Sequence, residues 1–307
     1  MGRYIARRLL LTIPVLFGAT FLLFALVYAL PGDPIAALAG DRPLAPAVEA
    51  ELRNRYHLDD PLLVQYGKYL AALAQGDLGT DFAGRSVSAT IAERLPVTAR
   101  LAGVAIAFEA LIGLVAGVLA GIRKGSFFDN LVLVSTIGVV SIPVFVLGFV
   151  TQITLGLELG LFPISGIDQG LYSYLLPGFV LASLSVAFVA RLSRTSLVEN
   201  LRHDYVRTAK AKGLPPRTVV GKHALRNSLI PVVTFLGTDL GALLSGAIVT
   251  EGIFNIPGLG RTVFQAVNSG EGAVVVGIVT LFVFFYIFVN LVVDILYAAL
   301  DPRIRYE

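Results

Sequence analysis

The sequence contains no cysteine, so this chain of 307 residues has neither a disulfide nor a thiolate centre. It has only three histidines, His57, His203 and His223, and none of them lies near another in the sequence. A histidine-rich metal site is therefore not expected. The pattern G-x-x-x-x-G-K-[ST] is also missing, so the chain has no phosphate loop of that kind to cradle a nucleotide.

Charged residues are scarce at 15%, against roughly 25% in soluble proteins, whereas hydrophobic residues reach 56%. Water is not the main solvent for a chain of this composition. A net charge of +3 and a pI near 9.2 are compatible with a nucleic-acid partner. The basic residues lie beside apolar runs, however, where they report membrane orientation instead. The sequence therefore predicts a protein surrounded by membrane lipid and no binding of nucleic acid.

A helix that crosses a bilayer needs about 20 mainly apolar residues. The sequence has six such runs: 9–30, 98–122, 130–156, 174–195, 229–250 and 274–299. We therefore predict an all-α bundle that forms a single transmembrane domain over residues 1–307. The third run contains Pro143 and is expected to be kinked, tilted or broken, and Arg191 and Arg194 are expected to mark the cytoplasmic end of the fourth.

Basic residues in short segments predict the orientation, because positive charge is retained on the cytoplasmic side. They cluster before the first run, after the second run and between residues 191 and 226, whereas the segment 157–173 has none. Both termini and the loop 196–228 are therefore expected in the cytoplasm, and the loop 31–97 outside. A signal peptide cleaved near Ala37-Leu38-Ala39 is disfavoured, since the first run of about 22 residues exceeds a signal core of 7 to 15.

The cytoplasmic segment from Asp204 to Pro216 predicts a short helix over 205–212. Asp204 is suited to cap it, Gly213 to end it, and the proline pair that follows prevents its continuation. Tyr205, Ala209 and Gly213 recur every four residues and share a face with small side chains, which a partner can approach closely. The alternative is a solvated basic loop, because Arg207, Lys210 and Lys212 occupy other positions.

This segment resembles the permease subunits of ATP-binding-cassette importers, whose cytoplasmic loop carries the pattern E-A-A-x-x-x-G. Gly213 matches the glycine and Ala209 the second alanine, whereas Thr208 and Arg207 stand for the first alanine and the glutamate. The sequence from Tyr205 to Leu214 looks like the version in dipeptide, oligopeptide and nickel permeases.

The resemblance to the B-type subunit of that subfamily covers nearly the whole chain. The matching strings are Tyr4-Ile5-Ala6-Arg7-Arg8-Leu9-Leu10, Leu30-Pro31-Gly32-Asp33-Pro34, Gly76-Asp77-Leu78-Gly79, Arg94-Leu95-Pro96-Val97-Thr98, His223-Ala224-Leu225-Arg226-Asn227-Ser228-Leu229-Ile230-Pro231, Glu251-Gly252-Ile253-Phe254-Asn255-Ile256-Pro257-Gly258-Leu259-Gly260 and Leu300-Asp301-Pro302-Arg303-Ile304-Arg305-Tyr306. Two positions depart from the pattern, Asp81 where a serine is usual, and Glu271-Gly272-Ala273 where an Arg-Asp pair followed by proline is expected.

The resemblance implies a type I importer permease fold in the bacterial inner membrane. It implies a second, related permease subunit, two ATPase subunits that hold ATP and magnesium, and an extracytoplasmic substrate-binding protein. The residues it assigns to ATPase coupling are Tyr205, Arg207, Thr208, Ala209, Lys212, Gly213 and Leu214. No catalytic residue and no cofactor of its own are expected for this chain. Dipeptides, oligopeptides, glutathione, haem and nickel chelates all remain open as ligands.

Three carboxylates lie within the apolar runs, where an ionisable group usually faces a bundle interior or water. Asp239 and Glu109 are candidates for the translocation route, with a structural hydrogen bond between helices as the alternative. Asp294 is a third candidate, although its place near the cytoplasmic end favours packing. The small residues Gly103, Gly113, Gly117 and Gly121 of the second run predict close helix packing.

Two other classes of membrane protein also use buried carboxylates. An ion-coupled secondary carrier predicts transport without partners and leaves the cytoplasmic helix unexplained. An intramembrane enzyme needs a nucleophile motif or paired ligands inside the spans, and no histidine lies in one. The ATP-driven permease is therefore the preferred function.

Overall fold

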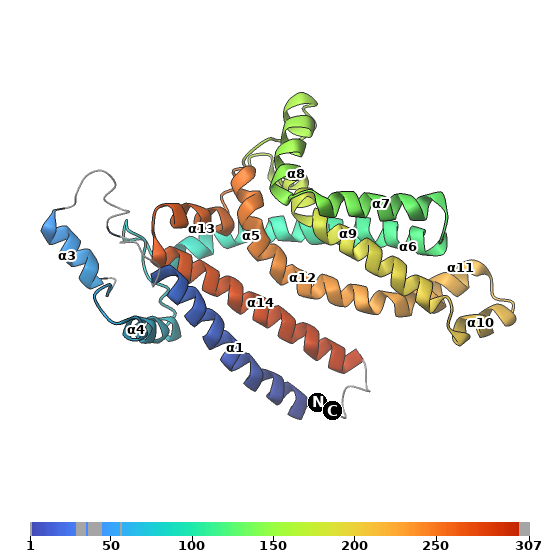
Figure 1. Cartoon of the computed structure of the whole chain (residues 1–307), viewed down its shortest axis with the longest axis horizontal. Coiled ribbons are helices and arrows are strands. Elements are labelled where there is room, and N and C mark those ends of the chain that lie inside the picture. The colour runs from blue at the N-terminus through green and yellow to red at the C-terminus, as the bar shows by residue number, and fades with distance from the viewer. Residues whose placement is uncertain (1, 29–34, 36–44, 56, 301–307) are drawn as a thin grey trace. The chain divides into compact units, whose positions relative to one another are not determined.

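The computed structural model describes residues 2–28, 35, 45–55 and 57–300 (Figure 1). The described residues are helical almost throughout, with one isolated antiparallel bridge between Thr80 and Ser86. The predicted all-α architecture is therefore confirmed over this part of the chain. The strings 30–34 and 301–306, together with the disfavoured cleavage site at 37–39, lie outside the described residues.

The chain divides into two compact units. The first unit comprises residues 1–98 and 257–307 and contains α1 (Gly2–Tyr28), α3 (Pro46–Arg55), α4 (Leu62–Ala74), the start of α5 (Val87–Phe108), α13 (Leu259–Asn268) and α14 (Gly272–Leu300). The second unit comprises residues 99–256 and contains the rest of α5, η1 (Glu109–Gly113), α6 (Leu114–Ile122), α7 (Phe127–Ser141), α8 (Val144–Thr151), η2 (Gln152–Glu158), η3 (Gly170–Tyr174), α9 (Leu175–Asn200), α10 (Asp204–Ala211), α11 (Pro216–Thr218), η4 (Val219–Ala224) and α12 (Leu225–Ile253).

Helices coincide with all six apolar runs. Among the described residues, five continuous helical stretches are long and apolar enough to cross a membrane: Ala6–Tyr28, Val87–Ile122, Gly170–Asn200, Pro216–Ile253 and Gly272–Ile295. The remaining run, the third (130–156), forms α7 followed by α8 and η2. The helical segments Phe127–Ser141 and Val144–Glu158 are bent by 101° relative to each other. Pro143 causes this break, because the ring forces the preceding residue, Ile142, out of the helical conformation and into the extended one (φ −96°, ψ 123°).

In the first unit, α1 and α14 lie side by side (Figure 1). Tyrosines of α4 fasten that helix to both of them. The Tyr66 hydroxyl lies 2.9 Å from the Thr20 hydroxyl of α1, and the Tyr69 hydroxyl donates to Thr280 of α14 at 2.8 Å. Burial raises the pKa of Tyr69, so this phenol keeps the proton that it donates.

In the second unit, α9 is the central helix, in contact with α6, α7 and α12 (Figure 1). Gly113 and Gly117 allow α6 to approach it closely. A methyl group added at Gly117 would lie 2.4 Å from the Ala190 carbonyl oxygen, and one at Gly113 would lie 2.6 Å from Val189. Close packing is thus confirmed for these two glycines, whereas a methyl group at Gly103 meets no atom within 4 Å, so the expectation was wrong there.

Two arginines of α9 hold α7 against it. Arg194 donates to both carboxylate oxygens of Asp129, at 2.5 and 2.8 Å, and Arg191 donates to Thr136 at 2.9 Å. Asp129 also accepts from the Gly125 backbone at 2.8 Å, so the buried carboxylate is well satisfied. Helix α9 itself continues past both arginines to Asn200. That Arg191 and Arg194 mark the cytoplasmic end of the fourth apolar run stays a prediction.

Candidate functional site

The short helix of the predicted coupling segment is α10, Asp204–Ala211. His203, not Asp204, occupies the position before its first turn, and no side chain caps it, so the expected aspartate cap was wrong. Its end follows the prediction: Gly213 takes a left-handed conformation (φ +74°), which glycine adopts without steric cost. The Gly213 and Leu214 backbone amides donate to the carbonyls of Lys210 and Ala209, which closes the helix in a Schellman motif.

An apolar cluster attaches α10 to the rest of the second unit. Its buried members are Leu197 of α9, Val206 and Ala209 of α10, and Val219 and Ala224 of η4, with Val118, Leu201 and Leu214 packed against them. Val206 has no exposed surface and Ala209 only 4%. The prediction that Ala209 faces a partner was therefore wrong: a turn of α10 buries it against this chain's own helices.

The opposite face of α10 is exposed and carries four side chains, Asp204, Arg207, Thr208 and Ala211. Tyr205 lies on the flank, where its hydroxyl donates to Asn200 at 2.6 Å and its ring stacks on His203. Among the other residues assigned to coupling, Lys212 and Gly213 are exposed and Leu214 is half-buried. The exposed face of α10 is therefore available to a partner, and the apolar cluster on its other side holds α10 against α9 and η4.

Two of the three intramembrane carboxylates meet in the second unit. Glu109, in the π-helical turn η1, is completely buried, and its carboxyl group interacts with that of Asp239 on α12, which is half-buried. Three buried oxygens of this pair have no hydrogen-bond partner among the described residues: Oε1 and Oε2 of Glu109 and Oδ2 of Asp239. Two ionised carboxylates only accept hydrogen bonds, so the pair needs either one proton shared between the two groups or a donor from another molecule.

Asp294 belongs to the first unit and pairs with Arg8 of α1, with 3.2 Å between Oδ2 and Nη1. The pair joins the two adjacent helices α1 and α14. This contact supports the packing alternative for Asp294, and its part in a translocation route stays a prediction.

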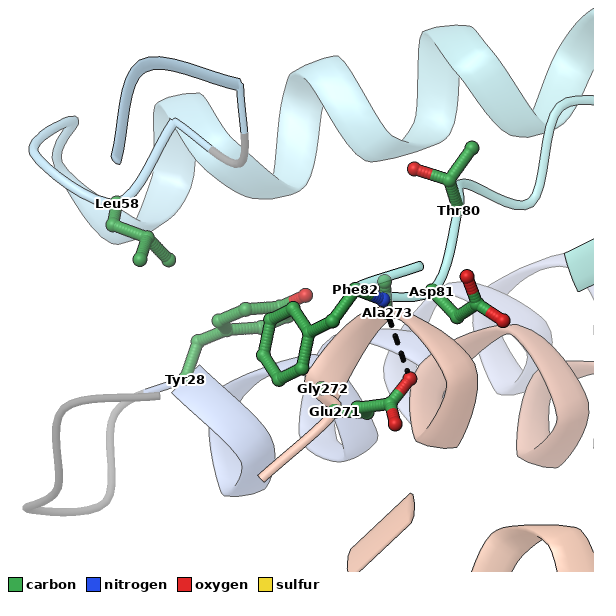
Figure 2. Close-up of a pocket in the computed structure, with 8 residues that line it drawn as sticks. All are labelled: Tyr28, Leu58, Thr80, Asp81, Phe82, Glu271, Gly272 and Ala273. Carbon is green, nitrogen blue, oxygen red and sulfur yellow. Dashed lines mark hydrogen bonds between the residues drawn. The ribbon is translucent and has the colours of Figure 1, made fainter. Parts of the chain in front are cut away.

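The two departures from the family pattern, about 190 residues apart, come together in the first unit. Asp81 and Glu271 line one small cavity of about 20 Å³, shared with Tyr28, Leu58, Thr80, Phe82, Gly272 and Ala273. In Figure 2 the Glu271 side chain accepts a hydrogen bond from the Phe82 backbone amide, at 3.4 Å. This proximity was not predictable, because no feature of the sequence near residue 81 indicates a contact with residue 271.

A larger hollow of about 230 Å³ shares Tyr28 and Ala273 with this cavity. Its lining includes His57, Lys68 and Tyr69. Lys68 donates to Asp60 at 2.6 Å, which holds the pKa of that exposed carboxyl group below its usual range. The first unit thus carries a mixed polar and aromatic surface that sequence reasoning missed.

The long apolar helices define a polytopic membrane protein. The chain belongs to the family of binding-protein-dependent transport system inner membrane components: the family's sequence model matches residues 113–306, and that of its N-terminal region matches residues 1–102. It therefore has the type I importer permease fold predicted from the sequence, and it is a transport permease of the inner membrane.

Relatives align with the chain from end to end. It is 40% identical to the Di/tripeptide transport system permease protein DppB of Pseudomonas aeruginosa and 38% identical to the Dipeptide transport system permease protein DppB of Alkalihalophilus pseudofirmus. It is 39% identical to the Glutathione transport system permease protein GsiC of Escherichia coli. Each alignment covers 100% of both chains.

Proposed function

We propose that this chain forms half of the channel of an ATP-driven importer for di- and oligopeptides or similar small solutes such as glutathione. A second, related permease subunit supplies the other half, two ATPase subunits hydrolyse ATP with magnesium, and an extracytoplasmic binding protein delivers the solute. The observation that carries the proposal is full-length similarity to permeases named for dipeptides, tripeptides and glutathione. Because each of these relatives aligns with the chain over its whole length, we expect the chain to have the same role as a permease subunit beside separate partner subunits.

The helix α10 is proposed as the element through which the ATPases act on the channel. A machine of this kind needs a stiff connection between nucleotide-driven closure and the spanning helices. The apolar cluster provides one, because it packs α10 directly on α9 and η4, and η4 continues without a break into α12. Displacement of α10 is therefore expected to move α9 and α12 with it.

Uptake by the reconstituted complex tests the solute class. Proteoliposomes that contain this chain, its partner permease and the ATPases are expected to import dialanine or glutathione when ATP and the loaded binding protein are present. A panel of dialanine, a pentapeptide, glutathione, haem and a nickel chelate identifies the solute. Import of haem or the nickel chelate without any peptide or glutathione would contradict the proposed class.

Thiol labelling tests the orientation, with both termini and α10 proposed in the cytoplasm. The chain has no cysteine, so single substitutions can be probed without background. Ala83→Cys and Ala211→Cys form a matched pair, because both alanines are exposed and lie in the outer loop and in α10, respectively. An impermeant maleimide added to spheroplasts is expected to label residue 83 and, only after lysis, residue 211. Labelling of residue 211 on spheroplasts, with residue 83 labelled only after lysis, would contradict the proposed orientation.

A further inference from the structure

Within the part of the chain that the structure describes, no ion pair joins Glu109 or Asp239 to a basic side chain. Glu109 is 0% exposed and has no hydrogen-bond partner in the described part of the chain. An unpaired buried charge is costly, so such groups are normally neutralised by an ion, a proton or a hydrogen-bond donor. The basic residues on α9, the helix packed on η1, are engaged elsewhere, since Arg194 binds Asp129 and Arg191 binds Thr136.

The number of hydrogen-bond acceptors that lack a donor at Glu109 and Asp239 matches the number of donors of a primary ammonium group. Three buried oxygens are unsatisfied, namely Glu109 Oε1 and Oε2 and Asp239 Oδ2. A primary ammonium has three N–H donors and no acceptor, and its single positive charge is attracted by both carboxylates. A hydroxyl or an amide would bring an acceptor into the same place, where it would meet only other acceptors.

The location of the pair also fits a transient ligand. Glu109 lies in a π-helical turn, a rare distortion that occurs frequently at functional sites. Asp239 retains exposed surface and lies mid-helix on α12, near the small residues Gly237 and Gly241. The pair therefore extends from a fully buried side chain at Glu109 to a partly exposed one at Asp239.

We propose that Glu109 and Asp239 bind the primary ammonium group of the transported solute as it passes through the channel. This inference rests on the proposed function, because a peptide and glutathione each carry an α-ammonium group. Asp239 makes the first contact, and Glu109 completes the site when the movement of α12 uncovers it. A lysine side chain from the partner permease is the other possible source of the same chemistry.

Single-turnover transport of dialanine from preloaded binding protein is the measurement, because preloading removes the affinity of the binding protein from the result. Glu109→Gln and Asp239→Asn keep size and remove charge, and each is expected to slow transport about tenfold or more. The double exchange Glu109→Asp with Asp239→Glu keeps both charges and is expected to recover most of the rate. Methylammonium, which offers the same donors, is expected to compete with dialanine in the unmodified complex and not in Asp239→Asn.

The outcomes separate the alternatives. Unchanged transport by both Glu109→Gln and Asp239→Asn would overturn the proposal and show that the pair has no role in transport. An equal loss of transport in the charge-preserving double exchange would overturn it in favour of a role in packing. Absence of competition by methylammonium would overturn it in favour of a proton or a lysine of the partner, and this readout needs no variant to fold. Failure of the unmodified complex to import dialanine at all would instead count against the proposed solute class.

Discussion

Replacing Thr208 or Ala211 with tryptophan is expected to release the ATPases while leaving the bundle folded. Both side chains lie on the exposed face of α10, opposite Val206 and Ala209. A bulky ring there obstructs a docked partner and adds no strain inside this chain. Interface residues of central importance contribute about 2 kcal/mol or more, which corresponds to roughly 30-fold weaker association. Co-purification of the ATPases and ATP-driven uptake, assayed on the same preparations, measure the effect.

Two controls make the α10 result specific. Lys124→Trp places the same ring on an exposed position between α6 and α7, outside α10, and is expected to leave ATPase association unchanged. Ala209→Glu, by contrast, puts a charge into the apolar cluster and is expected to lower thermal stability as well as association. Association and uptake at the level of the unmodified complex for both Thr208→Trp and Ala211→Trp would remove α10 from the coupling route.

Gly117→Ala is expected to be the most destabilising single-methyl substitution in the second unit. The new methyl group would approach a backbone carbonyl at 2.4 Å and the Ser193 side chain at 2.6 Å, and a backbone atom cannot yield by changing rotamer. Overpacking costs typically 1–3 kcal/mol, so the melting temperature in detergent is expected to fall by roughly 5 °C. A size-exclusion assay after heating measures this fall.

Gly103→Ala is the matched control for this packing prediction. It adds the same methyl group to the same apolar stretch, but into open space. It is expected to leave the melting temperature unchanged or to raise it slightly, since alanine favours a helix over glycine by about 1 kcal/mol. Equal melting temperatures for the two variants would contradict the close packing of α6 on α9.

The spanning helices were predictable because the lipid bilayer imposes their length and composition directly on the sequence. The break between α7 and α8 was likewise predictable from Pro143, because a proline restricts the backbone of the residue directly before it. The helix boundaries were less accurate: α5 begins at Val87, eleven residues before the expected span, because Glu93 and Arg94 interrupt the apolar pattern in its first turns.

The orientation of side chains around α10 was not predictable from its own sequence. The four-residue spacing grouped Tyr205, Ala209 and Gly213, but the partners that decide which side is buried, Leu197 and Val219, lie outside the segment. The contacts of Asp129 with Arg194 and of Glu109 with Asp239 join residues 65 and 130 positions apart, and only the tertiary fold brings them together. The glycines of the stretch Val87–Ile122 share this limitation, because spacing alone does not distinguish the closely packed Gly117 of α6 from Gly103 of α5.

Site-directed cross-linking of the assembled complex tests the central claim most directly, that ATPases act on this permease through the exposed face of α10. A photoreactive maleimide attached to Lys212→Cys, an exposed position beside the face on which Thr208 and Ala211 lie, is expected to form an adduct with an ATPase subunit. The same reagent on Ala83→Cys is expected to form none. An ATPase adduct from residue 83, or none from residue 212 in a complex that still imports solute, would contradict the account.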